Sequence, residues 1–255
     1  KMFVSENSVV RQIWGKSDTV LFIFAGASAE FALNKAVDWL YFTGRLPADP
    51  LGRLFSTVGY ARQIVFSTEQ VAHHAIDRMA KIHAGVEQKR GQSIPDWAYR
   101  DVLYMLIDYS IRSFELLERK LRAAEKAEVF DTFYRVGNRM GLKGLPLTYE
   151  QWLTDRQAHL AQNLKESKYT KDLYRQYRKH LGPIRYLLLL ETQKIVTPEI
   201  VNRMLGLGKF YWLVPILDVY KITRKLNLDW LLKEAILPGA YKSEIKALDH
   251  NPAQV

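Results

Sequence analysis

Apolar residues recur every three or four positions along most of this 255-residue chain, which is the spacing of one face of an α-helix. The clearest stripe consists of Leu103, Ile107, Ser110, Phe114, Leu117 and Leu121. No stretch alternates strictly enough between apolar and polar residues to predict a sheet, and neither an internal repeat nor an interdomain linker is visible. The pattern predicts an all-α fold in which residues 1–255 form a single-domain helical bundle.

The same pattern predicts where individual helices begin and end. Further helices are expected over residues 8–14, 19–41, 129–140, 172–180 and 184–193, with a stop at Gly182-Pro183. Mixed charges over residues 119–128 are assigned to the solvated end of the preceding long helix. Within that long helix, Ser110 is expected to bond a backbone carbonyl and Asp108 to lie at the surface.

The stretch from Asp49 to Glu87 carries the candidate chemistry on two consecutive helices. Asp49 is placed to cap the first helix, and Pro50 suits its first position. Arg53 and Thr57 then lie one turn apart at the edge of the apolar face, where they can reach a pocket. Such a pair is also common on ordinary helix surfaces, so both interpretations stay open.

The second helix places one histidine among core positions. Its N-cap is predicted at Ser67, with Gln70 completing a capping box. Its apolar stripe is formed by Ala72, Ile76, Met79 and His83. An inward histidine is most often a hydrogen-bonded core residue, and metal ligation is the less common alternative.

Composition narrows the cofactor chemistry. The absence of cysteine excludes disulfides, zinc–thiolate sites, cysteine-ligated iron–sulfur clusters and thiolate-ligated haem. We find no glycine-rich phosphate loop, no nucleophile elbow and no pair of Glu-x-x-His motifs. A histidine-ligated haem remains among metal-dependent oxidation chemistries. His159 and His180 are possible ligands too, but they lie on more polar segments than His83.

The net charge of +10 is concentrated around residues 165–179 and 221–225. Solvated helix faces explain these runs, and the alternative is attraction to anionic lipid head groups or to nucleic acid. No nucleic-acid-binding motif is present, so no nucleic-acid partner is expected. No run is apolar enough to span a bilayer and the first residues do not resemble a signal peptide, so we expect a cytoplasmic or peripheral membrane protein.

The order Asp49-Pro50, Arg53, Thr57 and then His83 resembles the latex-clearing protein and MpaB-type oxygenase family, the rubber oxygenase catalytic domain. The similarity runs from about residue 8 to about residue 208. It includes Ala25-Gly26-Ala27-Ser28-Ala29, His83-Ala84-Gly85-Val86 and Gly144-Leu145-Pro146-Leu147-Thr148. The small residues near Gly26 permit close approach by another helix or by a flat ligand.

The resemblance implies an all-helical fold that binds haem b. It implies that His83 is the proximal ligand of the iron, and that Arg53 and Thr57 lie beside the haem on the oxygen or substrate side. It further implies that the chain uses dioxygen to cleave an apolar substrate, such as an isoprenoid, at a carbon–carbon double bond.

The chain departs from the family pattern in two ways. Many members carry an arginine one turn after the histidine, followed by glycine, where this chain has Glu87 and Gln88. The latex-clearing branch tends to have a lysine where this chain has Ser56. These departures leave open a second function: a haem-free helical protein of the same fold that binds a hydrophobic ligand or partner.

Overall fold

The computed structural model describes residues 1–44, 48–209, 211–215, 217 and 220. Its helices are α1 (Val9–Trp14), α2 (Ser17–Leu33), α3 (Val37–Phe42), α5 (Pro50–Phe66), α6 (Glu69–Arg90), α7 (Asp96–Leu117), α8 (Ala123–Arg139), α9 (Tyr149–Asn163), α10 (Lys168–Val196) and α11 (Glu199–Leu205). Extended pairing in this part of the chain is limited to isolated bridges, Met2 with Thr68 and Asn34 with Leu164. The all-α bundle predicted from the sequence is confirmed. The basic run at residues 221–225 lies outside the described residues.

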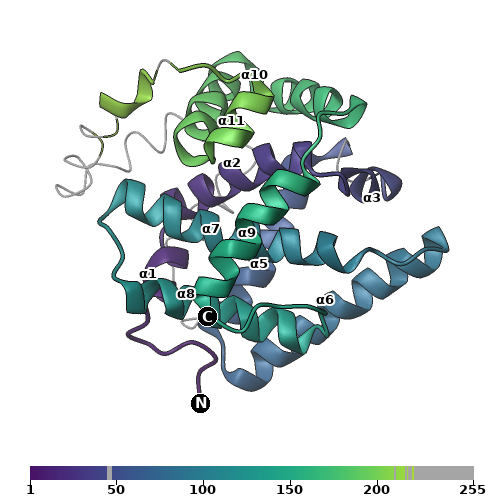
Figure 1. Ribbon diagram of the computed structural model, residues 1–255, viewed down its shortest axis with the longest axis vertical. Helices are drawn as coiled ribbons and strands as arrows, with labels where there is room; N and C mark the ends of the chain where they lie inside the picture. The colour runs from purple at the N-terminus through teal and green to yellow at the C-terminus, as the bar shows by residue number, and fades with distance from the viewer. Residues whose placement is uncertain (45–47, 210, 216, 218–219, 221–255) are drawn as a thin grey trace.

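Helix α2 is the central element of the bundle. Figure 1 shows it between α10 and α11 on one side and α7 on the other, and its most extensive contacts are with α7 and α10. At Gly26 an added Cβ would lie 2.3 Å from the ring of Tyr109 on α7. The small residues near Gly26 therefore allow tight packing of two helices, and the Tyr109 ring fills the space that a flat ligand would need there.

The predicted helix over residues 19–41 is wrong because the chain breaks at Asn34. The Asn34 side chain accepts a hydrogen bond from the backbone N–H of Ala36 at 2.8 Å and donates one to Asp101 at 2.8 Å. Asparagine competes in this way with backbone hydrogen bonds and favours a helix end. As a result α2 stops at Leu33 and the separate helix α3 follows.

The charged residues 119–128 are likewise not a solvated helix end. Helix α7 stops at Leu117 and α8 begins at Ala123, six residues before the predicted start at 129. Glu125 accepts a hydrogen bond from the backbone N–H of Arg122 at 2.8 Å and pairs with Arg119 at 2.8 Å. Its carboxylate thus caps α8, since the first N–H groups of a helix lack partners within the helix.

The boundaries around the candidate site are mostly as predicted. Asp49 accepts a hydrogen bond from Gly52 at 2.9 Å, and Pro50 is the first residue of α5. The prediction that Ser67 caps the next helix and forms a capping box with Gln70 is wrong: Ser67 is the C-cap of α5, and the N-cap of α6 is Thr68, which makes no side-chain cap hydrogen bond. The backbone carbonyl of Ser67 instead accepts a hydrogen bond from Phe3 at 3.1 Å, which ties the N-terminal segment to this corner.

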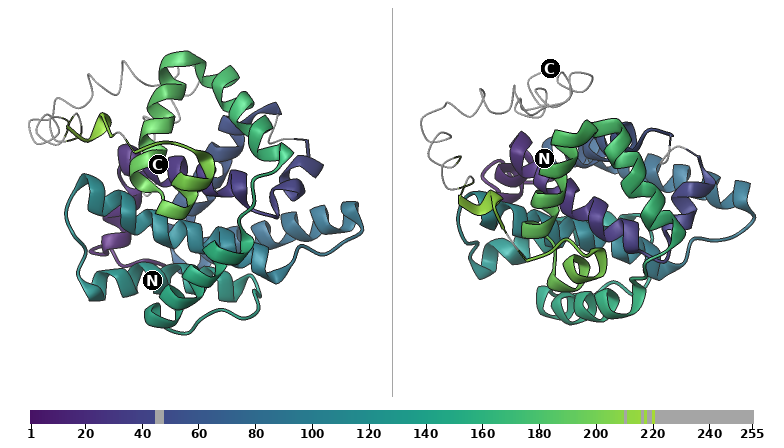
Figure 2. Two further views of the ribbon diagram at one scale, coloured as in Figure 1. Left: turned by 45° about the horizontal axis from the view of Figure 1, so that its top comes forward. Right: turned by 90° about the horizontal axis from the view of Figure 1, so that it is seen from above.

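Helix α10 bends at the predicted stop. Gly182 has φ 72° and ψ 173°, outside the helical region, and Pro183 follows it directly. A positive φ is accessible to glycine because it lacks a Cβ. The two halves of α10 therefore run in different directions, as Figure 2 shows for the green helix along the upper edge of its left view.

Candidate functional site

His83 lies on α6 where that helix leaves the core. On its stripe Ile76 is fully buried, Met79 packs against the core from a half-buried position, and His83 is half-buried. The Nδ1 atom of His83 is inaccessible to solvent and has no hydrogen-bond partner among the described residues. Most buried polar atoms are hydrogen-bonded, and this nitrogen is one of a few such atoms in the described residues for which no partner is found.

Tyr99 and Glu87 form the surroundings of the His83 ring. The ring centroids of His83 and Tyr99 are 5.3 Å apart with an interplanar angle of 57°. Glu87 accepts hydrogen bonds from the Tyr99 hydroxyl at 3.2 Å and from the backbone N–H of Ile94 at 2.8 Å. Glu87 therefore ties the end of α6 to the start of α7, and this connection holds Tyr99 against the imidazole.

Arg53 and Thr57 face each other on α5. The Arg53 guanidinium donates a hydrogen bond to the Thr57 hydroxyl at 2.9 Å, and that hydroxyl donates to the backbone carbonyl of Arg53 at 3.2 Å. Burial of His83 lowers its pKa, and the nearby Arg53 charge lowers it further, whereas the Glu87 charge acts in the opposite direction. Arg53 thus lies near His83, and the lowered pKa favours the neutral imidazole, the form that binds metals.

The basic residues that follow Glu87 are engaged elsewhere or exposed. Arg90 donates to Asp38 at 2.6 Å, and its guanidinium carbon lies 3.9 Å from the centroid of the Trp39 ring. Arg90 therefore holds α3 against the end of α6. Lys89 is exposed to solvent.

A haem would need fewer protein ligands at His83 than a bare metal ion would. Across the described residues, no cluster of three or more histidine, cysteine, aspartate or glutamate side chains could hold a metal ion. One imidazole, that of His83, would be enough to hold the iron of a haem. The unpartnered nitrogen of His83 and the lowered pKa, which favours its neutral form, are both compatible with such a ligand.

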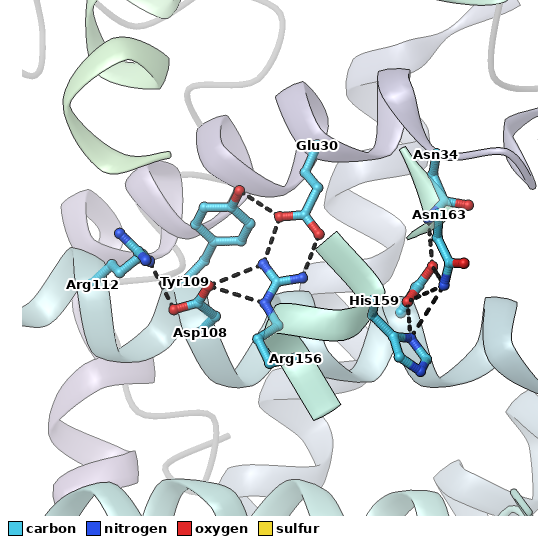
Figure 3. Close-up of polar contacts among 9 residues, drawn as sticks. Glu30, Asn34, Asp108, Tyr109, Arg112, Arg156, His159 and Asn163 are labelled. Atoms are coloured by element: carbon cyan, nitrogen blue, oxygen red, sulfur yellow. Dashed lines mark hydrogen bonds and ion pairs between the residues drawn. The ribbon is translucent and has the colours of Figure 1, made fainter. Parts of the chain in front are cut away.

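A second group of polar residues, buried except for the partly exposed Arg112, lies at the contact of α2, α7 and α9. We call it the Arg156 network, and its members are Glu30, Asp108, Tyr109, Arg112 and Arg156 (Figure 3). Arg156 binds Glu30 through two nitrogens at 2.5 and 2.6 Å and binds Asp108 at 3.0 and 3.1 Å. Tyr109 donates to Glu30 at 2.7 Å, and Arg112 donates to Asp108 at 2.7 Å.

The network corrects the prediction that Asp108 is a surface residue. Asp108 is buried because Arg156 reaches it from α9, 48 residues away in the sequence. Ser110, on the same helix, accepts a hydrogen bond from the Trp14 indole at 3.2 Å. Helical periodicity could identify neither partner, because both come from other helices.

His159 adjoins the network in a second buried cluster, also drawn in Figure 3. It is buried and binds Asp101, whose carboxylate also accepts hydrogen bonds from Asn34 and Asn163. His159 is therefore a core residue although the sequence around it is polar, and its Nδ1 atom already binds Asp101. His180, the other alternative ligand, is exposed on α10.

Comparison with known proteins identifies a family that the chain matches. The family model described as "ER-bound oxygenase mpaB/B'/Rubber oxygenase, catalytic domain" matches residues 12–214. This range includes the His83 surroundings and the Arg156 network. Neither the curated proteins nor the solved structures provide a match to the chain.

Proposed function

The chain belongs to the ER-bound oxygenase mpaB/B'/Rubber oxygenase catalytic-domain family, and from this membership we propose that it is a haem b-dependent oxygenase. Its co-substrate is dioxygen, and its substrate is apolar, with an isoprenoid chain cleaved at a carbon–carbon double bond as the leading candidate. The observation that carries the proposal is the His83 Nδ1 atom, which is buried and has no hydrogen-bond partner among the described residues.

Each nearby side chain has a role in this proposal. His83 would hold the iron, and Tyr99 limits rotation of its ring by packing 5.3 Å away. Arg53 supplies a fixed positive charge that favours negative charge developing on a reactant, and its bond to Thr57 at 2.9 Å keeps the guanidinium oriented. The haem, when bound, supplies the oxidation chemistry itself.

The second candidate is a haem-free binding protein of the same fold. It is favoured by Glu87, a carboxylate where many relatives carry an arginine, because a negative charge is unsuited to pair with a haem propionate. Arg90 is not available to take the role of that arginine, because it is paired with Asp38 at 2.6 Å. This candidate predicts a protein that binds apolar ligands but no haem.

Absorption spectroscopy of the purified protein, with and without added haem, separates the two functions. We expect a Soret band in the wild type. We expect His83→Ala to lose this band, because His83 is the one described histidine with a buried ring nitrogen that has no hydrogen-bond partner. His74→Ala is the matched control, since His74 is exposed on the same helix. A wild type that stays colourless after haem titration would contradict the oxygenase function and favour the haem-free binding protein. An unchanged Soret band in His83→Ala would show that His83 is not the ligand of the iron.

A further inference from the structure

The first half of α10 carries an exposed cationic stripe. Lys168, Lys171, Arg175 and Arg178 follow one another at intervals of three and four residues, and all are exposed. The opposite face of this segment is buried, with Leu173 packed against Ala32 of α2. The stripe therefore points away from the bundle, so its charges are available to a partner.

The surrounding acidic residues do not neutralise this stripe. Residues 165–179 contain six Lys or Arg and two Asp or Glu, an excess of 6 − 2 = 4 positive charges. The ion pairs are long, 3.6 Å between Lys171 and Glu166 and 3.9 Å between Arg175 and Asp172. Exposed pairs of this kind contribute little to stability, and giving them up for another anion costs little.

Exposed apolar side chains follow the stripe at the bend of α10. After Gly182 and Pro183, Ile184 is 75% exposed and Leu187 is 49% exposed. They are three residues apart and so lie on one side of the second half of the helix. Isolated exposed apolar residues are ordinary, but here two of them directly follow a run of cations.

We propose that the bend of α10 docks onto the surface of a bilayer that contains anionic phospholipids. The cations of the stripe bind the lipid head groups, and Ile184 and Leu187 enter the interface between head groups and acyl chains. A bilayer offers both a negative surface and an apolar layer beneath it, whereas a nucleic acid matches only the charge. Within the described part of the chain, no helix is both long and apolar enough to cross a membrane, so this contact is peripheral.

Sedimentation with vesicles of phosphatidylcholine, with and without phosphatidylserine, tests the charge component. The variant Lys171→Gln/Arg175→Gln/Arg178→Gln, which removes three of the four cations of the stripe, should bind anionic vesicles at least tenfold more weakly, since each cation near the surface contributes about fivefold. The matched control is Arg78→Gln/Lys81→Gln/Lys89→Gln, which removes the same charge from exposed positions of α6 and should bind like the wild type. Binding of the wild type should weaken as salt is added.

A fluorescent label tests the apolar component without depending on affinity. Because the chain contains no cysteine, Ile184→Cys can carry an environment-sensitive dye at a unique position. Its emission should shift to the blue on anionic vesicles, whereas the dye on Leu147→Cys, in the segment before α9, whose native side chain is 70% exposed, should not shift. Thermal unfolding of every variant confirms that it is folded.

Three outcomes would overturn the docking proposal. One is equal binding to vesicles with and without phosphatidylserine, or binding to neither. Another is an equal loss of binding in the α6 control. The third is tighter binding to duplex DNA than to anionic vesicles through the same α10 cations, which would assign the stripe to nucleic acid instead.

Discussion

The His83 surroundings and the Arg156 network are both polar sites within an apolar helical bundle, but they differ in how completely their polar atoms are hydrogen-bonded. Every guanidinium nitrogen of Arg156 binds a carboxylate, and its side chain is 2% exposed. The His83 Nδ1 atom is buried without a partner among the described residues. A saturated cluster fixes how helices pack, whereas an unsaturated buried atom costs stability and is available to a ligand.

The two sites also differ in how they treat charge. Burial alone would lower the pKa of Arg156, but the Glu30 and Asp108 charges outweigh it and raise that pKa. At His83, burial and the Arg53 charge act together to lower the pKa. The network therefore keeps its charges in the core, while the surroundings of His83 favour the neutral imidazole.

The largest expected effect tests whether the network is structural. Arg156→Met should reduce the free energy of unfolding by about 3–5 kcal/mol, because it leaves Glu30 and Asp108 buried without their shared cation. Arg112→Gln is the control: its side chain is 37% exposed, so the loss should stay below about 1 kcal/mol. Denaturant unfolding measures both. Equal losses in the two variants would mean that Arg156 does not organise the core.

A smaller effect is expected from the glycines of the two regions. Gly26→Ala should cost about 1–3 kcal/mol, because its Cβ would lie 2.3 Å from the Tyr109 ring. Gly85→Ala, two residues after His83, meets no atom within 4 Å and should stabilise α6 by up to about 1 kcal/mol. Thermal unfolding of the haem-free proteins compares them. A stabilised Gly26→Ala would contradict the close packing of α2 on α7.

The smallest expected effect is a pH dependence that belongs to His83. Its folded pKa is lowered from the ordinary value of 6.5, so the unfolded chain takes up a proton more readily as the pH falls. Stability should therefore be complete above the unfolded pKa and decrease as the pH drops toward the folded pKa. Unfolding of the haem-free protein between about pH 5 and 8 should show this component in the wild type. Its persistence in His83→Ala would assign it to another group.

Local signals predicted the parts of the fold that depend on neighbouring residues. Asp49 and Pro50 mark the start of α5, and the stop at Gly182-Pro183 appears as the bend of α10. These features act within about one helical turn, so the residue types alone identify them. The break at Asn34 was not predicted, because one of the two hydrogen bonds of its side chain goes to Asp101, which is 67 residues away in the sequence.

The sequence predicted the relations between site residues on the same helix, but not the contacts between helices. Spacing placed Arg53 with Thr57 and put His83 on the stripe of Ile76, because both relations lie within single helices. The contact of Tyr99 with His83, and the bond from Tyr99 to Glu87, required α7 to pack beside α6. The roles of Arg53, Thr57 and His83 toward a haem remain predictions.

By itself the sequence determined an all-helical chain, the caps and stops of several helices, and a histidine on the inner stripe of α6. Only the tertiary structure decided that Arg156 and His159 enter the core, while one nitrogen of His83 is left without a partner. The physical reason is that helical periodicity reports which face of a helix is apolar. Whether a buried polar atom is satisfied depends instead on side chains from other helices, which come together only when the bundle is packed.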